Sequence, residues 1–399
     1  IWERTPDDAA ELRAAVASLL EDGLTRSAAI RIALLRSPAL QAGFEEIGIA
    51  EAERVQAGLL TNPSFSLILT FPLNLGDVSA TLLGLLSDLW MTPVNEAIAE
   101  HALEGTLQRV AAKVVGTAAA AGAAYDSALY WSERVALERE KLRLRRDRLD
   151  AVRTKAGSDR DGSREAPDAE KELVDQELGL AFGEKELANA RIELEMALGL
   201  AEGESLPPLV DGFDVPPRGE WSSERVVPFA MQNRFDVAAA AAAVKGAEEA
   251  LERERRRVYG EVAIGPSYEG GFGDFDGGGP AIGLELPIFD QNQARIARAE
   301  LQLRRQRRLL EELRLRARGE VLAALAEAEY RRRRAAVLAE RSAAVARLAR
   351  AGAESALRTG ESSPREELLE TRRQALDSVA ELRRAETDLQ IALWGARAN

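Results

Sequence analysis

The sequence predicts a mainly α-helical protein with a small β part, built from two copies of one structural unit. Three observations carry this prediction. Helical stretches of about 60 residues are separated by polar breaks, and short alternating segments lie between them. The second half also repeats the order of the first at a spacing of about 198 residues, which aligns Ile98 with Ile296 and Gly162 with Gly360. A repeat this long is typical of a duplicated unit with internal pseudo-symmetry.

The first structural repeat is predicted over residues 1–204. A helix over 9–61, with a break near Pro38, ends at Asn62-Pro63, because the residue before a proline is disfavoured in the α conformation. A β-hairpin follows over about 63–91, since Phe65, Leu67, Leu69 and Phe71 alternate almost cleanly with Ser64, Ser66, Ile68 and Thr70. The poorer alternation of its returning segment, 79–91, predicts a bulge or a partly buried register.

Two long helices complete the first repeat. The first is expected from about Val94 to Lys155, some 90 Å at about 1.5 Å per residue. A loop near 156–167, here named the first tip, precedes a helix from about 168 to 198. A proline-rich connector over 205–221 then leads to the second half.

The second structural repeat is predicted over 222–399 and has the same order of elements. Its β-hairpin spans about 258–289, beginning with alternating residues from Val258 and returning through Ile282, Leu284, Leu286 and Ile288. A helix from about 291 to 357 carries an apolar seam at coiled-coil spacing. The second tip is expected near 359–364, followed by a last helix to about Trp394.

Composition limits the class of protein. Charged residues make up 30% of the 399 residues and aromatic residues only 5%, a profile typical of long helices. The net charge of -13 argues against a nucleic-acid partner, and the run Arg331–Arg334 is expected on a solvated helix face. With no cysteine and one histidine, His101, neither thiol chemistry nor a metal site is expected, and no cofactor.

The cellular location is not fixed by composition. No run of 18 apolar residues is present, so no transmembrane helix is expected. The opening residues, IWERTPDD, are polar and acidic rather than signal-like. Two alternatives stay open at this point: a cytoplasmic protein, or a form from which a leader has been removed.

The two hairpins predict an oligomer. Four strands cannot close a barrel, and an isolated sheet with one apolar face would expose its edges. Two copies would supply eight strands and three copies twelve. Each long helix has the length of two shorter helices placed end to end, so a helical tube should continue the barrel. The expected lipid-facing residues are Phe65, Leu67, Leu69, Phe71, Ile282, Leu284, Leu286 and Ile288, and the expected lumen residues are Ser66, Thr70, Glu261 and Glu285.

Acidic residues gather beside the two tips. Asp159 and Asp161 lie in the first tip, and Glu361, Glu366 and Glu367 lie in or after the second. Repeated by symmetry, they would form rings that favour cations at an entrance or gate. The alternative is that they stabilise helix N-termini, which acidic residues commonly do.

Several motifs, in order along the chain, resemble the outer-membrane efflux protein family typified by TolC. Asn62-Pro63 and Asn233-Arg234-Phe235-Asp236 are similar to its Asn-Pro and Asn-Arg-Pro-Asp motifs, and 286–290 (LPIFD) to its Leu-Pro-Ile/Leu-Phe segment. The continuation Gln291-Asn292-Gln293 is similar to the heavy-metal efflux branch. Gly360 with Ser363, Glu366 and Leu368 resembles the family's tip motif.

The resemblance implies a homotrimer that forms a twelve-stranded β-barrel in the outer membrane of a Gram-negative bacterium. An α-helical tunnel would cross the periplasm. Docking through the tip turns, at Gly162, Gly360 and Ser363, would engage a periplasmic adaptor protein and an inner-membrane pump, such as a resistance-nodulation-division transporter. The exported substrate stays open.

The expected function is therefore a passive exit channel for efflux or type I secretion, without catalysis. The alternative is a soluble coiled-coil scaffold, which accounts for the helices and the acidity but not for two matched hairpins with apolar faces. An enzyme is not expected, because no nucleophile–base constellation is apparent and the run 270–279 (GGFGDFDGGG) lies within a hairpin rather than between a strand and a helix.

Overall fold

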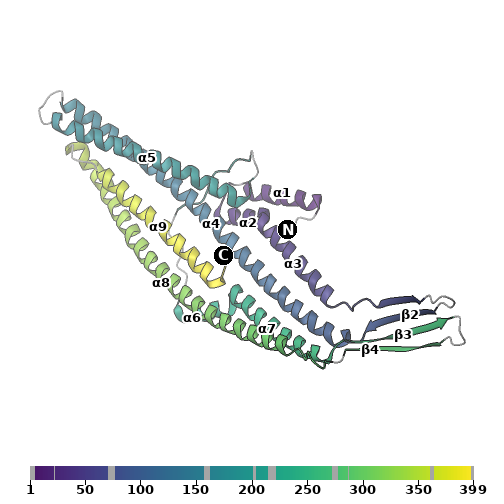
Figure 1. The fold of residues 1–399 in the computed structure, drawn as a ribbon. Helices are drawn as coiled ribbons and strands as arrows, with labels where there is room; N and C mark the ends of the chain where they lie inside the picture. The colour runs from purple at the N-terminus through teal and green to yellow at the C-terminus, as the bar shows by residue number, and fades with distance from the viewer. Residues whose placement is uncertain are drawn as a thin grey trace. The chain divides into compact units, whose positions relative to one another are not determined.

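The computed structural model describes residues 5–21, 23–70, 77–156, 162–200, 204–213, 222–271, 277–285, 287–359 and 364–396. The fold is mainly α-helical with one small antiparallel sheet (Figure 1). The chain divides into two compact units. The first comprises 1–42, 112–234 and 317–399, and the second 43–111 and 235–316. Both predicted repeats contribute to each unit, so the units are not the repeats.

The N-terminal stretch forms three helices. α1 spans Pro6–Leu20 and α2 spans Arg26–Arg36, while α3 begins at Pro38 and ends at Ala57. The break at Pro38 was predicted, but the break between α1 and α2 was missed. Gly23 adopts a φ of 88°, which favours glycine, and the Thr25 hydroxyl accepts a 3.1 Å hydrogen bond from the Ala28 N–H to cap α2.

Four long helical segments lie side by side in the first unit, in the order α5, α4, α9, α8 (Figure 1). We name this set the four-helix row. α4 spans Asp88–Ala156, α5 Gly162–Leu198, α8 Gln293–Thr359 and α9 Pro364–Trp394, and the row uses α4 from 112 and α8 from 317. Ion pairs join each neighbouring pair in antiparallel register: Arg139–Glu184 and Arg146–Glu177, then Lys141–Glu370 and Arg134–Asp377, then Arg331–Glu381 and Arg332–Glu386.

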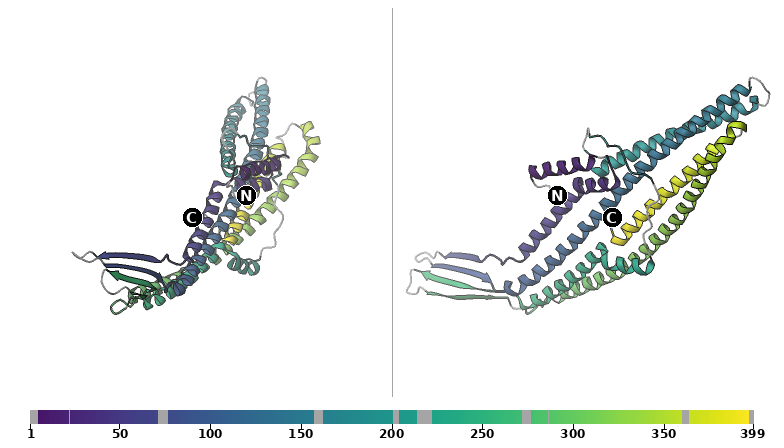
Figure 2. Two further views of the ribbon diagram at one scale, coloured as in Figure 1. Left: turned by 90° about the vertical axis from the view of Figure 1, so that its right-hand side faces the viewer. Right: turned by 180° about the vertical axis from the view of Figure 1, so that it is seen from behind.

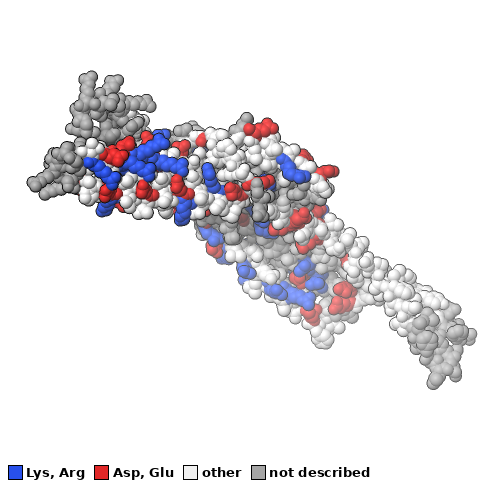
Figure 3. Space-filling view, turned by 90° about the horizontal axis from the view of Figure 1, so that it is seen from above, with Lys and Arg blue, Asp and Glu red and all other residues white. Residues whose placement is uncertain are grey.

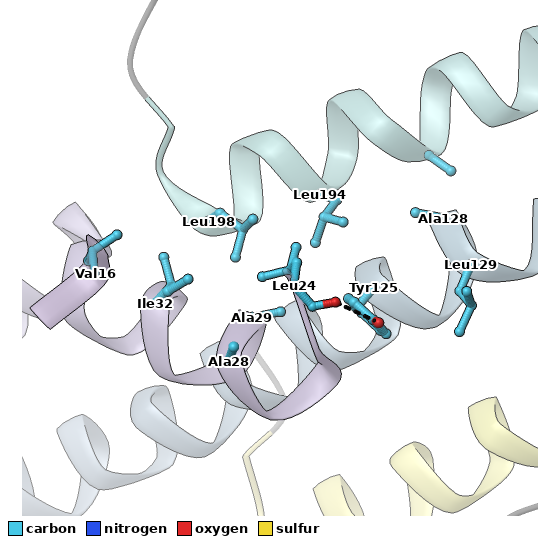
Figure 4. Packing of buried hydrophobic residues seen from close by; sticks show 11 residues of the cluster. Val16, Leu24, Ala28, Ala29, Ile32, Tyr125, Ala128, Leu129, Leu194 and Leu198 are labelled. Atoms are coloured by element: carbon cyan, nitrogen blue, oxygen red, sulfur yellow. Dashed lines mark hydrogen bonds between the residues drawn. The ribbon is translucent and has the colours of Figure 1, made fainter. Parts of the chain in front are cut away.

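The principal core of the first unit lies where α2 and α5 meet α4 (Figure 4). Leu24, Ile32 and Leu194 are almost completely buried, as is the ring of Tyr125. Burial of each such Leu or Ile side chain contributes roughly 1.5–3 kcal/mol. The Tyr125 hydroxyl donates a 2.9 Å hydrogen bond to the Leu24 carbonyl, which satisfies a polar group that burial would otherwise penalise.

A second core joins α6 (Ser223–Asn233) to α8 and α9. Arg234, which follows α6, is 3% exposed. Its guanidinium donates a 2.8 Å hydrogen bond to the Ala392 carbonyl and a 3.0 Å bond to Glu320. The arginine of the Asn-Arg-Phe-Asp motif therefore ties the start of the second half to its last helix.

The second unit combines α3, the first turns of α4 and α8, and α7 (Phe235–Arg256) with the sheet. Arg54 on α3 donates a 2.9 Å hydrogen bond to Glu96 on α4. Arg307 on α8 donates a 2.6 Å bond to Glu248 on α7. These contacts join the helix that precedes each β-hairpin to the helix that follows it: α3 to α4, and α7 to α8.

The sheet has the order β1-β2-β3-β4, with every neighbouring pair antiparallel (Figure 2). β1 spans Ser64–Thr70 and β2 Asp77–Leu85, while β3 spans Val262–Gly271 and β4 Gly277–Leu284. β1 and β4 form the two edges. The expected bulge is absent from Asp77 to Leu83, where β2 pairs with β1 in unbroken register.

Three strand boundaries differ from the sequence prediction. Residues 88–91 begin α4 instead of continuing β2, because the Ser87 carbonyl already accepts first-turn hydrogen bonds from the Trp90 and Met91 N–H groups. Residues 257–259 form a 3₁₀ turn, and Gly260, with a φ of 69°, separates this turn from β3. β4 ends at Leu284, which leaves Ile288 beyond the strand.

The other predicted boundaries agree more closely. α8 ends at Thr359, two residues beyond its expected end, and α9 begins at Pro364, the last residue of the expected second tip. α5 starts at Gly162, six residues before its expected start, so the first tip is shorter than predicted. Of the connector, 205–213 is irregular and forms a parallel bridge between Leu209 and Leu24; residues 214–221 lie outside the described part of the chain.

Candidate functional site

The sheet has two chemically different faces. Residues that pair across antiparallel strands share a face, and the register places Phe65 opposite Leu82, and Ile264 opposite Ile282. We name this the apolar face. In the described strands its large side chains are Phe65, Leu67, Leu82, Ile264, Tyr268, Ile282 and Leu284.

The apolar face is open to its surroundings. Phe65 is 66% exposed and Ile282 70% exposed, and the other five large side chains of this face are exposed as well. No charged side chain is visible over the described strands in the view of Figure 3. A contiguous exposed apolar surface of this kind marks a site of contact with lipid or with another protein.

The predicted lipid-facing residues fall into three groups. Phe65, Leu67, Ile282 and Leu284 lie on the apolar face, as expected. Leu69 belongs to β1, whereas Phe71 and Leu286 lie outside the described residues. Ile288 is 68% exposed but follows β4, so its assignment to a strand is wrong.

The opposite face of the sheet is largely polar or small. Ser66 pairs with Thr81, and Thr81 pairs with Ser267, all on this second face. Thr70 is the last residue of β1 and pairs with Asp77. The other two predicted lumen residues do not lie within strands: Glu261 precedes β3 and Glu285 follows β4, joined by a 3.2 Å backbone hydrogen bond.

A polar network that the sequence did not predict joins α4 to α9 in the first unit. The Tyr130 hydroxyl donates a 2.8 Å hydrogen bond to Asp377, and Arg134 donates another of 2.8 Å to the same carboxylate oxygen. Burial, reinforced by the neighbouring Asp377, raises the pKa of Tyr130 to about 12. The phenol therefore remains a hydrogen-bond donor at physiological pH.

The network continues for two more helical turns. Lys141 donates a 3.0 Å hydrogen bond to Glu370, which also pairs with Arg373. The hydrogen bonds from Arg373, ahead of those from Lys141, lower the pKa of Glu370 to about 2. Burial would raise the pKa of Glu138, but hydrogen bonds from Gln176 and Arg134 outweigh it and lower that pKa.

We name this set, Tyr130, Arg134, Glu138, Lys141, Gln176, Glu370, Arg373 and Asp377, the α4–α9 network. Its charged groups alternate in sign along two facing helices. Such a set resists separation of the helices, because parting them would leave half-buried charges without partners.

The predicted tip residues are only partly described. Gly162 is the first residue of α5. Glu366 lies in the first turn of α9, and Glu367 follows it with an exposed side chain. Asp159, Asp161, Gly360, Glu361 and Ser363 lie outside the described residues, so the acidic ring stays a prediction.

Three further features of the described residues bear on function: metal-binding groups, pockets and membrane-spanning helices. No group of three His, Asp or Glu side chains converges in this part of the chain as a metal site would require. One pocket of ≈ 590 Å³ in the first unit is lined mainly by apolar residues such as Val115, Phe229 and Trp394, with Arg26 and Arg225 as its charged groups. Among the described helices, none combines the length and the apolar character needed to cross a membrane.

Comparison with solved structures identifies the fold. The chain is similar to CusC, known from crystal structures that concern folding and transmembrane channel formation, with a TM-score of 0.75, 17% identity and 92% of each chain covered. It is similar to the MtrE outer-membrane channel of Neisseria gonorrhoeae, with a TM-score of 0.69, 21% identity, and 92% of this chain and 88% of that chain covered. It is also similar to the CmeC outer-membrane channel of Campylobacter jejuni, with a TM-score of 0.67, 14% identity, and 93% and 86% covered.

No protein-family model matches the sequence, and no curated protein matches it. At these identities the structural likeness establishes the fold. The fold is that of outer-membrane channels such as MtrE and CmeC, over nearly the full length of the chain. The prediction drawn from the motifs is thereby confirmed at the level of the fold.

Proposed function

We propose that this chain is one of three identical subunits of an outer-membrane exit channel in a tripartite efflux or type I secretion system. The observation that carries the proposal is the sheet. It has an exposed apolar face, an opposite face of mostly polar or small residues interrupted by Ile68, Leu83 and Leu85, and two edge strands, β1 and β4, each paired on one side in the described structure. The shared fold with proteins described as outer-membrane channels supports it.

Three copies suit a conduit better than two. Edge pairing of β4 in one copy with β1 in the next would satisfy the open backbone groups of both edges. Two copies would give an eight-stranded barrel, whose interior is filled by its own side chains. Three copies give twelve strands and leave room for a water-filled path, with the apolar face in contact with lipid and Ser66, Thr81 and Ser267 facing the lumen.

The helices supply the remainder of the conduit. In this proposal the two halves of the chain are duplicated units, and their helices form a tunnel through the periplasm of a Gram-negative bacterium. The tip turns at Gly162 and Gly360 would dock a periplasmic adaptor, which links the channel to an inner-membrane pump, such as a resistance-nodulation-division transporter. The pump supplies the energy, and the channel itself performs no catalysis.

The α4–α9 network and the acidic tips would control the entrance. Opening requires the helices of each subunit to move apart near the tips, and the network opposes this movement. The acidic residues Asp159, Asp161, Glu361, Glu366 and Glu367, repeated three times, would favour cations there.

The proposal is tested by fractionation and by electrical recording. The protein expressed with a leader should enter the outer-membrane fraction, require detergent for extraction and have the mass of three chains in detergent. In planar bilayers it should form ion-conducting channels. The alternative, a soluble coiled-coil scaffold, predicts a protein that stays in the soluble fraction without detergent and conducts no ions. A soluble protein that conducts no ions would refute the channel proposal. A monodisperse single chain in buffer without detergent would refute it as well.

A further inference from the structure

The pocket of ≈ 590 Å³ in the first unit lies where helices from the two halves of the chain meet. α2 and α4 supply one half of its lining, and α6 and α9 supply the other half (Figure 1). Pockets of about 300–1,000 Å³ are typical of sites for small organic molecules. The lining includes no residue of the α4–α9 network, so the pocket is a separate feature of this unit.

The walls of the pocket are apolar. Val115 of α4 is half-buried and Leu393 of α9 is only 2% exposed. The ring of Phe229 on α6 packs edge to face against Trp394 on α9, with the two ring centroids 5.4 Å apart. This is a preferred geometry for two aromatic rings. Phe229 remains exposed at the edge of the pocket, so a ligand has access to these walls from solvent.

The charge of the pocket has one sign. Among the described residues that line it, Arg26 of α2 and Arg225 of α6 are the only charged ones, and none is acidic. The side chain of Arg26 is 37% exposed, and Arg225 is exposed. A guanidinium group binds a carboxylate or another oxyanion through paired hydrogen bonds. The lining therefore joins apolar walls to a positively charged edge.

The Arg26 side chain is held in position from two directions. Its Nε donates a 3.0 Å hydrogen bond to Asp126, a carboxylate that Arg383 shares. A Cβ on Gly122 would lie 2.7 Å from the Arg26 Nη2, so the guanidinium lies against the bare backbone of α4. The nearby Asp211 carboxylate accepts a 2.6 Å hydrogen bond from the Arg26 backbone N–H and does not line the pocket. A side chain positioned in this way loses less conformational freedom when an anion binds.

We propose that this pocket binds an amphipathic organic anion. Its apolar chain or ring would contact Val115, Phe229 and Trp394, and its acidic head group would bind Arg26 and Arg225. The two guanidinium groups disfavour a cation, and a small inorganic anion would leave the apolar walls in contact with water. The inference goes beyond the proposed channel, because it concerns a binding site in the helical part of the chain and requires no transport.

Because the chain has no cysteine, a single reporter cysteine tests occupancy of the pocket. Gln390 lines the pocket and is exposed. In the full chain purified in detergent, octanoate should slow the alkylation of Gln390→Cys by a maleimide, and the effect should saturate. The neutral analogue 1-octanol should slow it much less. The matched reporter Asp388→Cys, exposed on α9 outside the lining, should react at the same rate with and without octanoate.

Substitutions at the charged edge test the role of the head group. Combined with Gln390→Cys, Arg225→Gln should weaken protection by octanoate about tenfold or more. Gly122→Ala keeps both charges, but its Cβ displaces the Arg26 guanidinium, so protection should weaken there as well. Arg31→Gln removes an exposed arginine of α2 that does not line the pocket. This matched control should leave protection unchanged.

Four outcomes would overturn the proposal. Alkylation at position 390 that octanoate does not slow would refute the site, and equal protection by 1-octanol would show that the pocket does not select an anion. A loss of protection in Arg31→Gln as large as that in Arg225→Gln would trace binding to the general surface charge. A cysteine at 390 that fails to react without octanoate, while one at 388 reacts, would show that the protein itself fills the pocket. None of these results depends on conductance, so the pocket and the channel are tested independently.

Discussion

Tyr130 on α4 and Asp377 on α9 are joined by a 2.8 Å hydrogen bond, although 247 positions separate them in the chain. Arg134 donates to the same oxygen of Asp377, so one carboxylate receives a neutral and a charged donor. Hydrogen bonds to a charged group are stronger than neutral ones. This carboxylate therefore holds two donors of α4 against α9.

Removing the Asp377 carboxylate should loosen the two helices. Asp377→Asn leaves Arg134 half-buried without its full counter-charge, and the free energy of unfolding should fall by about 1–3 kcal/mol. Tyr130→Phe removes only the neutral donor and should cost about 1 kcal/mol. Thermal unfolding followed by circular dichroism measures both.

Conductance shows whether the α4–α9 network controls channel opening or only stabilises the fold. Both variants should raise the open probability in planar bilayers, because the proposed opening separates these helices. Tyr259→Phe, at a tyrosine that is 72% exposed, is the matched control and should change neither stability nor conductance. If the variants have the same open probability as the unsubstituted channel, the α4–α9 network does not control opening.

The Glu370 carboxylate should make this part of the structure sensitive to acid. Its pKa is lowered from 4.5 to about 2, so the folded state favours the charged form. The stabilisation is complete above pH 4.5 and is lost as the pH falls toward 2. Glu370 is partly exposed, so after allowance for solvent screening its contribution should be about 1 kcal/mol or less.

The measurement compares the unsubstituted protein with Glu370→Gln at pH 7 and at pH 2. The difference in unfolding temperature should be present at pH 7 and should nearly vanish at pH 2. Glu311→Gln, at an exposed glutamate on α8, serves as the control. A difference that persists unchanged at pH 2 would show that the charge of Glu370 is not the cause.

Charge substitutions on the two faces of β1 should have unequal effects. Leu67→Lys places an ammonium group on the apolar face, which costs about 2–4 kcal/mol near the middle of a bilayer. Ser66→Lys, one residue away on the polar face, should assemble normally. The fraction of trimer recovered from outer membranes measures assembly, and equal recovery of the two variants would contradict the assignment of faces.

Neutralising the acidic residues after the second tip should reduce cation preference. Glu366 and Glu367 lie near the start of α9, where a negative charge also stabilises the helix N-terminus by about 0.3–1 kcal/mol. The double variant Glu366→Gln with Glu367→Gln should therefore shift the reversal potential in a salt gradient toward zero, with a small fall in stability. An unchanged reversal potential would leave helix stabilisation as their role.

Local patterns in the sequence predicted those features that local chemistry determines. Pro38 predicted where α3 begins, because proline fits the first helical position. The alternation of Phe65 and Leu67 with serines predicted the two faces of β1. The fold, including its mainly helical class, was predicted because the motifs occur in order over most of the chain.

Other features depend on contacts or conformations that no local pattern encodes. Val258 and Gly260 alternate like a strand, yet Gly260 has a φ of 69°, and a Cβ there would lie 2.6 Å from the Glu285 carbonyl oxygen, so this position requires glycine. The α4–α9 network escaped prediction for a different reason. Tyr130 and Asp377 look like ordinary helix residues until two distant helix faces meet.

The buried phenol of Tyr125 imposes an order on the folding of the chain. It donates to Leu24, 101 residues earlier, and accepts a 3.4 Å hydrogen bond from the Asp211 N–H, 86 residues later. Contacts between such distant positions form slowly, because a long loop has to close first. The N-terminal helices therefore reach their full set of native contacts only when the segment around Asp211 is available. A chain truncated before Asp211 would leave Leu24 and its apolar neighbours more open to proteolysis.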